Sequence, residues 1–229
     1  MEPNVVNDLL DYGYKIVQNP SFFKFSLDSI LLADFVNINY TDKKLLDLCT
    51  GNAPLPIILS KNISSISCIE IQNEVYNLAK ESININNITN ISLINEDIKN
   101  WQNYFSPSTF DIITCNPPYF KYNETSNIND NIIKSIARHE IKITLEEIIK
   151  ISSKLLKSKG KLNIVYRPDR FIELVNYLKK YNFGIKRIEC AYDDFDKNCS
   201  IILVEAMKNG KDDLKILPPL LTKNYRGEK

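Results

Sequence analysis

The stretch C-N-P-P-Y-F at residues 115–120 places an amide and an aromatic ring in a stiff segment, directly after the apolar run 110–114. Proline has no N–H, fixes φ and restricts the residue before it, so two prolines in a row end a strand and do not start a helix cheaply. The side-chain oxygen of Asn116 and the carbonyl of Pro117 are therefore two rigid acceptors. Two such acceptors beside an aromatic ring suit a flat substrate that carries an amino group, such as adenine.

The exocyclic nitrogen of adenine is a poor nucleophile, because its lone pair is delocalised into the ring. Acceptors for its two N–H bonds stabilise the positive charge that develops on nitrogen as it attacks, and a rigid loop holds it in line for displacement. Stacking of the base on Tyr119 is worth roughly 1–3 kcal/mol. The motif predicts methyl transfer to an amino nitrogen, without a metal or a strong general base. The predicted catalytic residues are Asn116, Pro117, Pro118 and Tyr119.

Polar residues also mark the ends of three upstream strand candidates. Gly51, in D-L-C-T-G-N-A-P after the first strand, lets the backbone turn tightly and approach a ligand. Glu70 lies 23 residues after Asp47, where a carboxylate can accept both ribose hydroxyls of a nucleoside. Asp97 follows the third strand and could accept from an adenine amino group. Each residue alone has an ordinary explanation as a turn, a surface residue or a helix cap, but together they favour a nucleoside site.

The nucleoside predicted here carries no phosphate. A dinucleotide site would require G-x-G-x-x-G, to seat a pyrophosphate on a helix N-terminus, whereas the stretch C-T-G-N-A-P has one glycine. The sequence contains no G-x-x-x-x-G-K-[ST], which excludes a P-loop. S-adenosylmethionine has adenine, ribose and an amino-acid tail but no phosphate, so it is the predicted cofactor and methyl donor.

These residues need a scaffold that brings strand ends together. Apolar runs that predict strands lie at 44–48, 65–71, 91–95, 110–115, 161–166, 184–192 and 200–207. Segments with helical spacing or helix-start signals lie at 27–35, 53–61, 73–86, 98–104, 144–157 and 167–181. The alternation predicts an α/β, Rossmann-like, doubly wound sheet of seven strands, with one antiparallel edge strand and helices on both faces. Ligands of such sheets bind beyond the carboxyl ends of the strands.

Composition narrows the class of protein further. The chain has 229 residues, of which 44% are hydrophobic and 25% charged, as expected for one soluble globular domain. No run approaches the roughly 18–20 apolar residues of a membrane helix, and the acidic N-terminus lacks the basic region of a secretory signal. We therefore expect a cytoplasmic protein. Five scattered cysteines without C-x-x-C, together with one histidine, disfavour a disulfide framework or a metal site.

Charge is distributed unevenly along the chain. Residues 1–115 hold 7 basic and 13 acidic side chains, whereas residues 116–229 hold 22 and 15. The asymmetry fits a polyanionic partner for the second half, and it fits equally well a solvated, lysine-rich surface. A solvated charge is the simpler explanation for any single residue, but as a group these could contact RNA phosphates. The candidates are Arg167, Arg170, Lys186, Arg187 and Lys223.

The chain resembles the class I S-adenosylmethionine-dependent N6-adenine methyltransferases of the N-P-P-Y type. More closely, it is similar to the bacterial tRNA (adenine-N6)-methyltransferases that modify the adenine just 3′ of the valine tRNA anticodon. The resemblance spans nearly the whole chain, in the stretches 15–35, 47–56, 114–120, 136–140, 167–170 and 214–220.

The resemblance implies a class I methyltransferase domain at 41–229, preceded by a helical cap at 1–40 that contributes to the cofactor pocket. It implies that Arg138 and His139 serve RNA or the active site, and that residues 116–119 hold the target base. One departure is Asn52-Ala53-Pro54, where more distant methyltransferases often have a second glycine. The implied cofactor residues are Phe25, Ser26, Asp28, Asp47, Cys49, Thr50, Gly51, Asn52, Ala53, Glu70, Ile71, Asp97, Ile98 and Asn116.

The implied partner is a tRNA anticodon stem-loop, with neither a membrane nor a metal involved. A target base must leave its stack to reach a pocket at a sheet edge. An anticodon-loop adenine is already in single-stranded RNA, which makes flipping cheaper than from a duplex. The sequence does not indicate whether the protein is a monomer or a dimer.

Other functions remain open. N-P-P-Y also serves enzymes that methylate a glutamine of peptide release factors, since a carboxamide nitrogen poses the same lone-pair problem. Those enzymes carry an additional helical N-terminal domain, and only about 40 residues precede the first strand here. DNA adenine methylation usually needs a larger target-recognition region. A non-catalytic RNA-binding protein on the same scaffold is opposed by the intact motif. Cys115 could be a nucleophile, but a buried strand cysteine is favoured because nothing nearby would lower its pKa.

Overall fold

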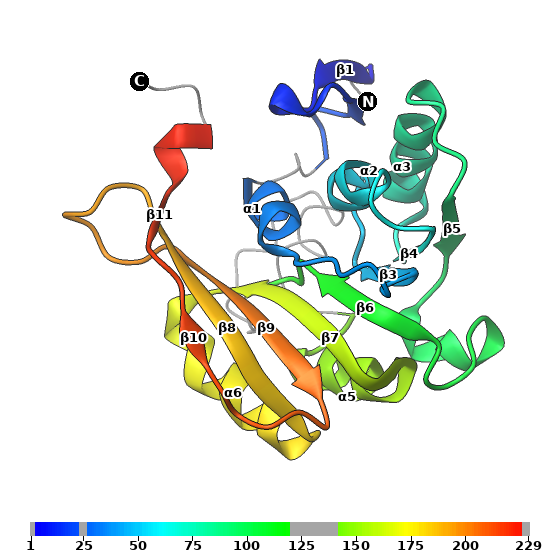
Figure 1. The fold of residues 1–229 in the computed structure, drawn as a ribbon. Coiled ribbons are helices and arrows are strands. Elements are labelled where there is room, and N and C mark those ends of the chain that lie inside the picture. The colour runs from blue at the N-terminus through cyan, green and yellow to red at the C-terminus, as the bar shows by residue number, and fades with distance from the viewer. Residues whose placement is uncertain (1–2, 23–26, 120–141, 226–229) are drawn as a thin grey trace.

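A mixed sheet runs through the middle of the computed structural model, which describes residues 3–22, 27–119 and 142–225 (Figure 1). Its long strands stand in the order β8-β9-β7-β6-β3-β4-β5, and two short strands, β10 and β11, pair with β8. The α/β doubly wound fold predicted from the sequence is confirmed. The strands are β3 (Lys44–Leu48), β4 (Ser65–Glu70), β5 (Ile91–Asn95), β6 (Phe110–Cys115), β7 (Leu156–Tyr166), β8 (Phe183–Tyr192), β9 (Ile201–Lys208), β10 (Lys215–Ile216) and β11 (Leu220–Leu221).

The sequence predicted that the antiparallel strand lies at the edge of the sheet. In the structure it lies one position inside, between β8 and β7. β9 is antiparallel to β7 on one side and to β8 on the other. The chain leaves β7 through helix α6 (Phe171–Lys180), crosses one strand position to form β8, and returns as β9 to fill the gap. These last two strands pair with each other. Their place in the sheet is not visible in the sequence, because periodicity reports no neighbours across a crossover.

Helices cover both faces of the sheet (Figure 1). One face carries α1 (Leu27–Phe35), α2 (Pro54–Leu59) and α3 (Asn73–Ile85), and the other carries α5 (Leu145–Leu155) and α6. Neighbouring residues of β3 pack on opposite faces of the sheet. Leu45 packs among residues of α1, α2 and α3, and Leu46 packs among residues of α5 and α6. This alternation is the period of two that a strand imposes on its side chains. No helix in the described ranges is long and apolar enough to cross a membrane.

Helix α5 begins as predicted and ends earlier. The Thr144 hydroxyl accepts from the Glu147 N–H and the Glu147 carboxylate accepts from the Thr144 N–H, which together form a capping box. The predicted segment ends at residue 157, just before the pair Lys159-Gly160, but the helix stops at Leu155. Lys159 instead has a φ of 63° inside β7, where the register against β6 shifts. The dipeptide therefore marks a β-bulge rather than a helix end.

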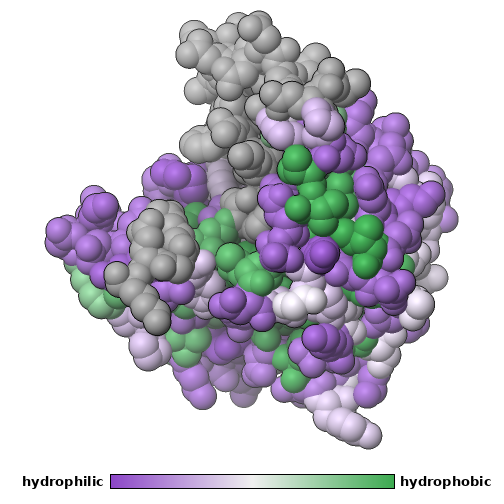
Figure 2. All heavy atoms as spheres, turned by 90° about the horizontal axis from the view of Figure 1, so that it is seen from above, coloured by the Kyte–Doolittle hydropathy of each residue, from purple (hydrophilic) through white to green (hydrophobic). Residues whose placement is uncertain are grey.

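The N-terminal segment contains a β-hairpin that sequence periodicity missed. β1 (Val5–Asp8) pairs antiparallel with β2 (Lys15–Gln18), through the short helix η1 (Leu10–Tyr12). All four residues of β1 are exposed, so the strand shows no alternation of buried and exposed positions. Figure 2, which looks down on this end of the molecule, shows hydrophobic side chains at the surface among hydrophilic ones. The predicted helical cap is thus a hairpin followed by a helix, α1.

The hairpin is attached to the sheet through α3. The Val17 N–H donates to the Ser82 hydroxyl at 2.9 Å, and the Asn86 side chain donates to the Lys15 carbonyl at 2.7 Å. Asn52, in the turn after β3, donates to the Val17 carbonyl at 2.9 Å. These bonds place β2 beside the turn that the sequence assigns to the cofactor. Three further short helices are η2 (Ile98–Asn103), η3 (Pro168–Arg170) and η4 (Thr222–Tyr225).

Candidate functional site

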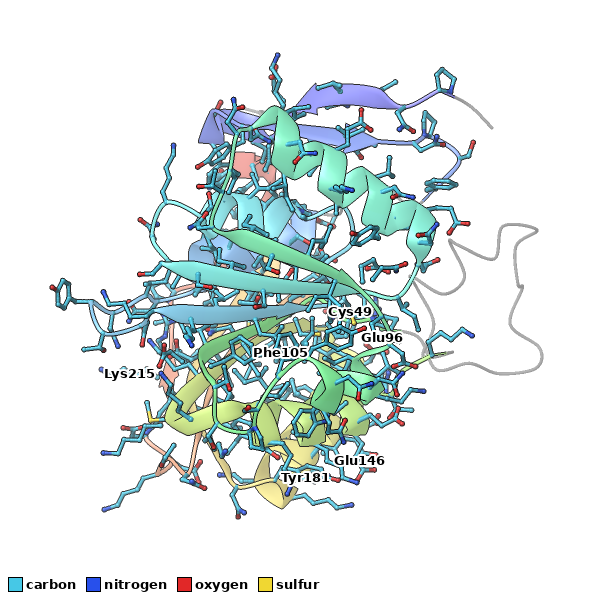
Figure 3. All side chains as sticks on the ribbon, turned by 90° about the vertical axis from the view of Figure 1, so that its right-hand side faces the viewer. Cys49, Glu96, Phe105, Glu146, Tyr181 and Lys215 are labelled. Atoms are coloured by element: carbon cyan, nitrogen blue, oxygen red, sulfur yellow. The ribbon has the colours of Figure 1, made fainter. Side chains whose placement is uncertain are left out.

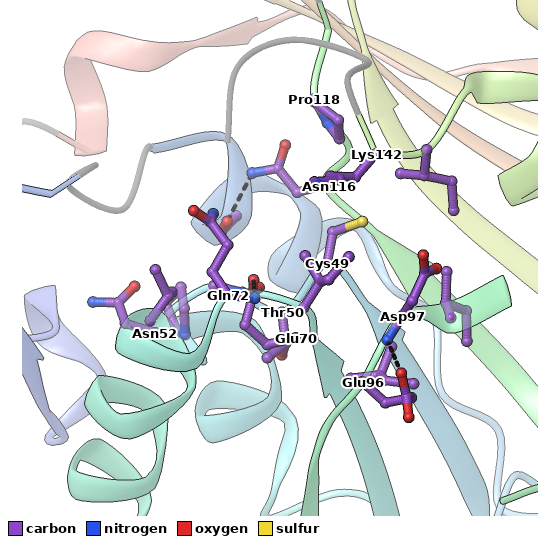
Figure 4. Close-up of a pocket in the computed structure, with 18 residues that line it drawn as sticks. Cys49, Thr50, Asn52, Glu70, Gln72, Glu96, Asp97, Asn116, Pro118 and Lys142 are labelled. Carbon is purple, nitrogen blue, oxygen red and sulfur yellow. Dashed lines mark hydrogen bonds between the residues drawn. The ribbon is translucent and has the colours of Figure 1, made fainter. Parts of the chain in front are cut away.

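A pocket opens at the carboxyl ends of β3, β4, β5 and β6, where the chain order reverses between β3 and β6 (Figure 4). This is the position at which doubly wound sheets bind ligands. Figure 3 shows two of its residues, Cys49 and Glu96, near one another at this end of the sheet. The lining residues are Ser29, Cys49, Thr50, Gly51, Asn52, Pro54, Ile69, Glu70, Ile71, Gln72, Val75, Glu96, Asp97, Ile98, Asn116, Pro118, Lys142 and Ile143.

The turn after β3 is backbone-strained. Gly51 has a φ of 59°, and Cys49 and Ala53 also have positive φ, at 56° and 68°. The left-handed region is easy for glycine and unfavourable for other residues. Ala53, in the stretch Asn52-Ala53-Pro54, adopts this geometry without being a glycine. Two non-glycine residues in this region, Cys49 and Ala53, lie within one turn, and such backbone strain clusters at functional sites.

Asp47 supports this turn from below the pocket and does not line it. Its carboxylate is buried and accepts from the Thr50 hydroxyl and, at 2.6 Å, from the Thr114 hydroxyl. Burial raises the pKa of Asp47 to about 7, although both hydroxyl bonds lower it, and the nearby charge of Glu70 raises it further. The geometry shows Asp47 holding Thr50 in place. Its predicted direct contact with the cofactor stays a prediction.

The raised pKa of Asp47 leads us to expect a pH-dependent stability. The unfolded carboxyl ionises near pH 3.8 and the folded one near 7, so between these values the folded state binds more protons. Its contribution to the unfolding free energy is therefore full below pH 4 and is lost as the pH rises to 7. Asp47→Asn cannot ionise, so its unfolding free energy should fall less between pH 4 and 7 in chemical denaturation. Parallel curves for the variant and the wild type would contradict this.

Glu70 connects the end of β4 to the same turn. Its carboxylate accepts from the Gly51 N–H at 3.0 Å and from the Gln72 N–H at 2.9 Å. Burial raises the pKa of Glu70, and these backbone donors oppose the rise. An ionised carboxylate offers about four lone-pair positions. The positions that the backbone N–H groups leave open are available to hydroxyl groups of a ligand in the pocket that Glu70 lines.

Asp97 lines the pocket and also caps a helix. Its side chain accepts from the Lys99 N–H at 2.9 Å and lies 3.3 Å from the Lys99 ammonium. The sequence offered the cap and the nucleoside contact as alternatives, and the position allows both. Glu96, which sequence reasoning missed, accepts from the Asp97 N–H at 2.8 Å and lines the pocket as well. Ile98 closes this side with a buried apolar side chain.

The N-P-P-Y segment is bound to the start of α1. The Asn116 amide nitrogen donates to the Ser29 hydroxyl at 2.9 Å, on the pocket wall (Figure 4). The Tyr119 hydroxyl donates to the Asn116 amide oxygen and, at 3.1 Å, to the Asp28 carboxylate. Asn116 and Pro118 line the pocket, whereas Pro117 and Tyr119 lie outside its lining set.

Tyr119 is fixed from its other side by Arg170. The Arg170 guanidinium donates to the Tyr119 carbonyl at 2.9 Å and pairs with Glu173 at 3.0 Å. The Tyr119 ring stands edge-on against the buried Tyr166 ring, with centroids 5.8 Å apart. Burial raises the pKa of Tyr119, and the charge of Asp28 adds to the rise, so the hydroxyl stays protonated at neutral pH. The aromatic residue of the motif is thus held by a guanidinium that the sequence had assigned to RNA.

Cys115 is a buried strand residue, as the sequence favoured. Its side chain is fully buried at the end of β6. Burial raises the pKa of the Cys115 thiol well above its usual value, and the neighbouring Cys49 thiol adds to the rise. A thiol that resists ionisation is a weak nucleophile. The alternative of pyrimidine C5 chemistry through Cys115 receives no support from this geometry.

The predicted RNA-contacting residues do not gather at the pocket within the described ranges. Arg187 pairs with Glu205 at 2.7 Å, lies over the Phe35 ring and donates to the Phe35 carbonyl at 2.8 Å. Lys186 pairs with Asp213, Arg167 with Asp169 and Lys223 with Asp194. Their contact with RNA stays a prediction. Phe25, Ser26, Arg138 and His139 lie outside the described residues.

Several lining residues escaped the sequence reasoning. No sequence motif marks Ser29 as a pocket residue. Lys142 and Ile143 stand just before Thr144, the N-cap of α5, and no pattern in the sequence assigns them to a site. Val75 and Gln72 belong to the start of α3, where helical spacing indicated only packing. Across the residues that the structure describes, no group of three or more His, Cys, Asp or Glu is arranged to hold a metal ion.

Known proteins share this fold and sequence pattern. The family model described as "Methyltransferase small domain" matches residues 14–143. A tRNA1(Val) (adenine(37)-N6)-methyltransferase of Flavobacterium psychrophilum is 21% identical over 93% of each chain. A protein of the same name from Aliivibrio salmonicida is 27% identical over 79% of this chain and 75% of its own. One from Bacteroides thetaiotaomicron is 29% identical, over 64% of this chain and 60% of its own.

Solved structures agree on the fold. A predicted O-methyltransferase from Agrobacterium tumefaciens superposes with a TM-score of 0.65 at 18% identity, covering 85% of this chain and 87% of its own. M. jannaschii TYW2 in complex with AdoMet gives 0.60 at 16% identity, over 90% and 86%. Because the family model matches more than half of the residues, including the turn after β3 and the N-P-P-Y segment, the chain belongs to the methyltransferase small domain family.

Proposed function

We propose that the protein transfers a methyl group from S-adenosylmethionine to the exocyclic N6 of an adenine in tRNA. The proposed target is the adenine just 3′ of the anticodon of valine tRNA, in the anticodon stem-loop. Relatives named tRNA1(Val) (adenine(37)-N6)-methyltransferase align along most of the chain, which supports the choice of substrate. The observation that carries the chemistry is the Asn116 amide, which is held by Ser29 on the wall of a pocket that also contains Glu70.

The residues that line the pocket have the chemistry that S-adenosylmethionine requires. Glu70 offers the carboxylate acceptors that a ribose diol requires, and the apolar side chains of Ile71, Ile98 and Val75 offer the flat contacts that an adenine ring requires. Thr50 and Gly51, in the strained turn, line the part of the pocket that would hold the amino-acid tail. When bound, S-adenosylmethionine supplies an electrophilic methyl group on a sulfonium.

The protein itself orients the nucleophile. Asn116 would accept one N–H of the target amine through its side-chain oxygen, and Pro117 the other through its backbone carbonyl. Both acceptors stabilise the positive charge that grows on nitrogen during transfer. Tyr119 would stack on the flipped base, a contact worth roughly 1–3 kcal/mol. This use of Tyr119 requires its ring to face the base.

Mass spectrometry of nucleosides tests the function. Bulk tRNA from cells with and without the gene is digested, and the modified position is mapped by fragment analysis. We expect N6-methyladenosine to disappear from one anticodon loop, and purified protein with S-adenosylmethionine to restore it. An unchanged tRNA profile would contradict the tRNA assignment and would direct the same assay to release-factor glutamine and to ribosomal RNA.

A further inference from the structure

A row of exposed lysines begins at the pocket and follows helix α5 away from it. Lys142 lines the pocket and lies two residues before Thr144, the N-cap of the helix. Lys150 and Lys154 are exposed on α5 itself. Residues four apart lie on the same side of an α-helix, so these two side chains extend from one face. The 11 residues of α5 span about 16 Å.

The row continues where α5 ends. Lys157 and Lys159 are exposed in the first part of β7, which follows the helix directly. Lys208, at the end of β9, donates from its Nζ atom to the Leu156 carbonyl at 2.6 Å. Burial lowers the pKa of Lys208, and the nearby positive charge of Lys154 lowers it further. The lysine track consists of Lys142, Lys150, Lys154, Lys157, Lys159 and Lys208.

Two carboxylates lie in the first turn of α5, and each has partners of its own. Glu146 pairs with the Lys180 ammonium at 2.6 Å and accepts from the Tyr181 hydroxyl at 2.8 Å (Figure 3). The hydrogen bond from Lys180 lowers the pKa of Glu146 most, and the charge of Lys150 adds to this, so two lysines share one carboxylate. Glu147 closes the capping box of the helix.

The far end of the track also has more positive than negative charge. Asp111 pairs with Lys157 at 2.6 Å and accepts from two backbone N–H groups. Within the described ranges, neither Lys154 nor Lys159 forms an ion pair with a carboxylate. Like charges four residues apart on a helix, and neighbouring ammonium groups such as those of Lys154 and Lys208, destabilise a fold unless a counter-charge is present. An anionic partner would supply that counter-charge.

We propose that the lysine track binds the phosphate backbone of the RNA stem that carries the target loop, so that a stem-loop whose base enters the pocket extends along α5. The proposal rests on the proposed function, because it takes the target to be a nucleotide of a stem-loop. Double-stranded nucleic acid carries roughly one negative charge per 2 Å of its axis, so α5 alone is long enough to face several phosphates. Contacts to phosphates position RNA without reading its sequence, which leaves the choice of base to the pocket.

A fluorescently labelled anticodon stem-loop, titrated with the protein at several salt concentrations, tests the proposal. The variant Lys150→Ala/Lys154→Ala removes two ammonium groups of α5, neither of which lines the pocket. Each phosphate contact contributes about 0.7–0.9 to the slope of log affinity against log salt, so the loss of two should raise the Kd at least about 10-fold at about 0.1 M salt and lower the slope by about 1.4–1.8. Lys150→Arg/Lys154→Arg keeps both charges and should bind within about 2-fold of wild type.

Lys15→Ala/Lys80→Ala is the matched control. It removes the same charge from two exposed lysines of β2 and α3, on the side of the sheet that carries α1, α2 and α3. Its Kd for the stem-loop should stay within about 2-fold of wild type, with the same salt dependence. A loss as large as that of the α5 variant would show that only net charge matters, and would overturn the lysine track.

Changing the RNA shows which phosphates are involved. Methylphosphonate linkages remove the charge of chosen phosphates, either in the stem or in the loop. On RNA with a neutral stem, Lys150→Ala/Lys154→Ala should change the Kd by less than about 2-fold, whereas on RNA with a neutral loop it should keep its full effect. The full effect on RNA with a neutral stem would overturn the assignment to the stem.

Failure of this proposal is distinguishable from failure of the proposed function. If the wild-type protein methylates the stem-loop but binds it no more tightly than Lys150→Ala/Lys154→Ala at any salt concentration, the lysine track is overturned and the function stands. Absence of tRNA methylation by the wild-type protein would instead overturn the proposed function, and that result is read before any variant is compared.

Discussion

Replacing Asn116 with alanine should lower kcat by roughly 100- to 1,000-fold, the loss typical when one preorganised group that stabilises developing charge is removed. The side chain lies on the pocket wall, where it is bonded to Ser29 and Tyr119, whereas the ribose hydroxyls are assigned to Glu70. The Kd for S-adenosylmethionine should therefore change by less than about 3-fold. Single-turnover methylation of tRNA and isothermal titration measure the two quantities.

Two further variants make the test of Asn116 more specific. Asn116→Asp keeps an acceptor oxygen in the same place, so it should retain more activity than Asn116→Ala. Asn103→Ala removes an exposed amide at the end of η2 and should leave both kcat and Kd unaltered. Equal losses of turnover in the alanine and aspartate variants would show that the acceptor is not what matters. A comparable loss of cofactor affinity would show that Asn116 is mainly a cofactor ligand.

Glu70→Ala should produce the opposite pattern. It removes a buried carboxylate that holds the Gly51 and Gln72 N–H groups and lines the pocket. Two hydrogen bonds from ribose hydroxyls to a carboxylate are worth about 1.5–3 kcal/mol each, so the Kd for S-adenosylmethionine should rise at least about 100-fold. At saturating cofactor, kcat should fall far less than in Asn116→Ala, because the amine acceptors remain in place.

The control for Glu70 lies four residues further along. Glu74→Ala removes an exposed carboxylate from the first turn of α3 and should leave cofactor affinity within about 2-fold of wild type. Glu70→Gln separates charge from shape: it keeps one acceptor oxygen, so its affinity should lie between those of wild type and Glu70→Ala. A Kd in Glu70→Ala close to that of wild type would refute the ribose assignment.

Much of this fold is visible in the sequence because local patterns determine it. β3, β5 and β6 have the predicted bounds, since their apolar runs end at polar or turn residues, and the capping box places the start of α5 at Leu145. The sequence-based prediction missed or misplaced the features that depend on which strands lie next to each other in the sheet. The exposed strand β1 has no alternation to detect, and the order of β8 and β9 depends on a crossover that leaves no trace in periodicity.

The same distinction applies to the site: local patterns predicted some of its residues, and others depend on contacts between distant parts of the sequence. Four site residues stand at or just after the ends of strands, so their convergence was predictable once the strands were known to be parallel: Gly51, Glu70, Asp97 and Asn116. Ser29 reaches Asn116 across 87 residues of sequence, and no local pattern encodes such a contact. Arg170 was read as a phosphate contact because a surface arginine and a structural one look alike in sequence. Its bonds to Glu173 and the Tyr119 carbonyl become visible only in three dimensions.

Helix α1 is fastened at both ends, and this has a consequence for the protein during its synthesis. Its first turn bonds to Asn116 and Tyr119, and its last carbonyl, that of Phe35, accepts from Arg187, which pairs with Glu205. A ribosome that adds roughly 5–20 residues per second therefore makes the N-P-P-Y motif some seconds before the strands that anchor its support. The nascent chain should acquire a competent site only after β9 has emerged.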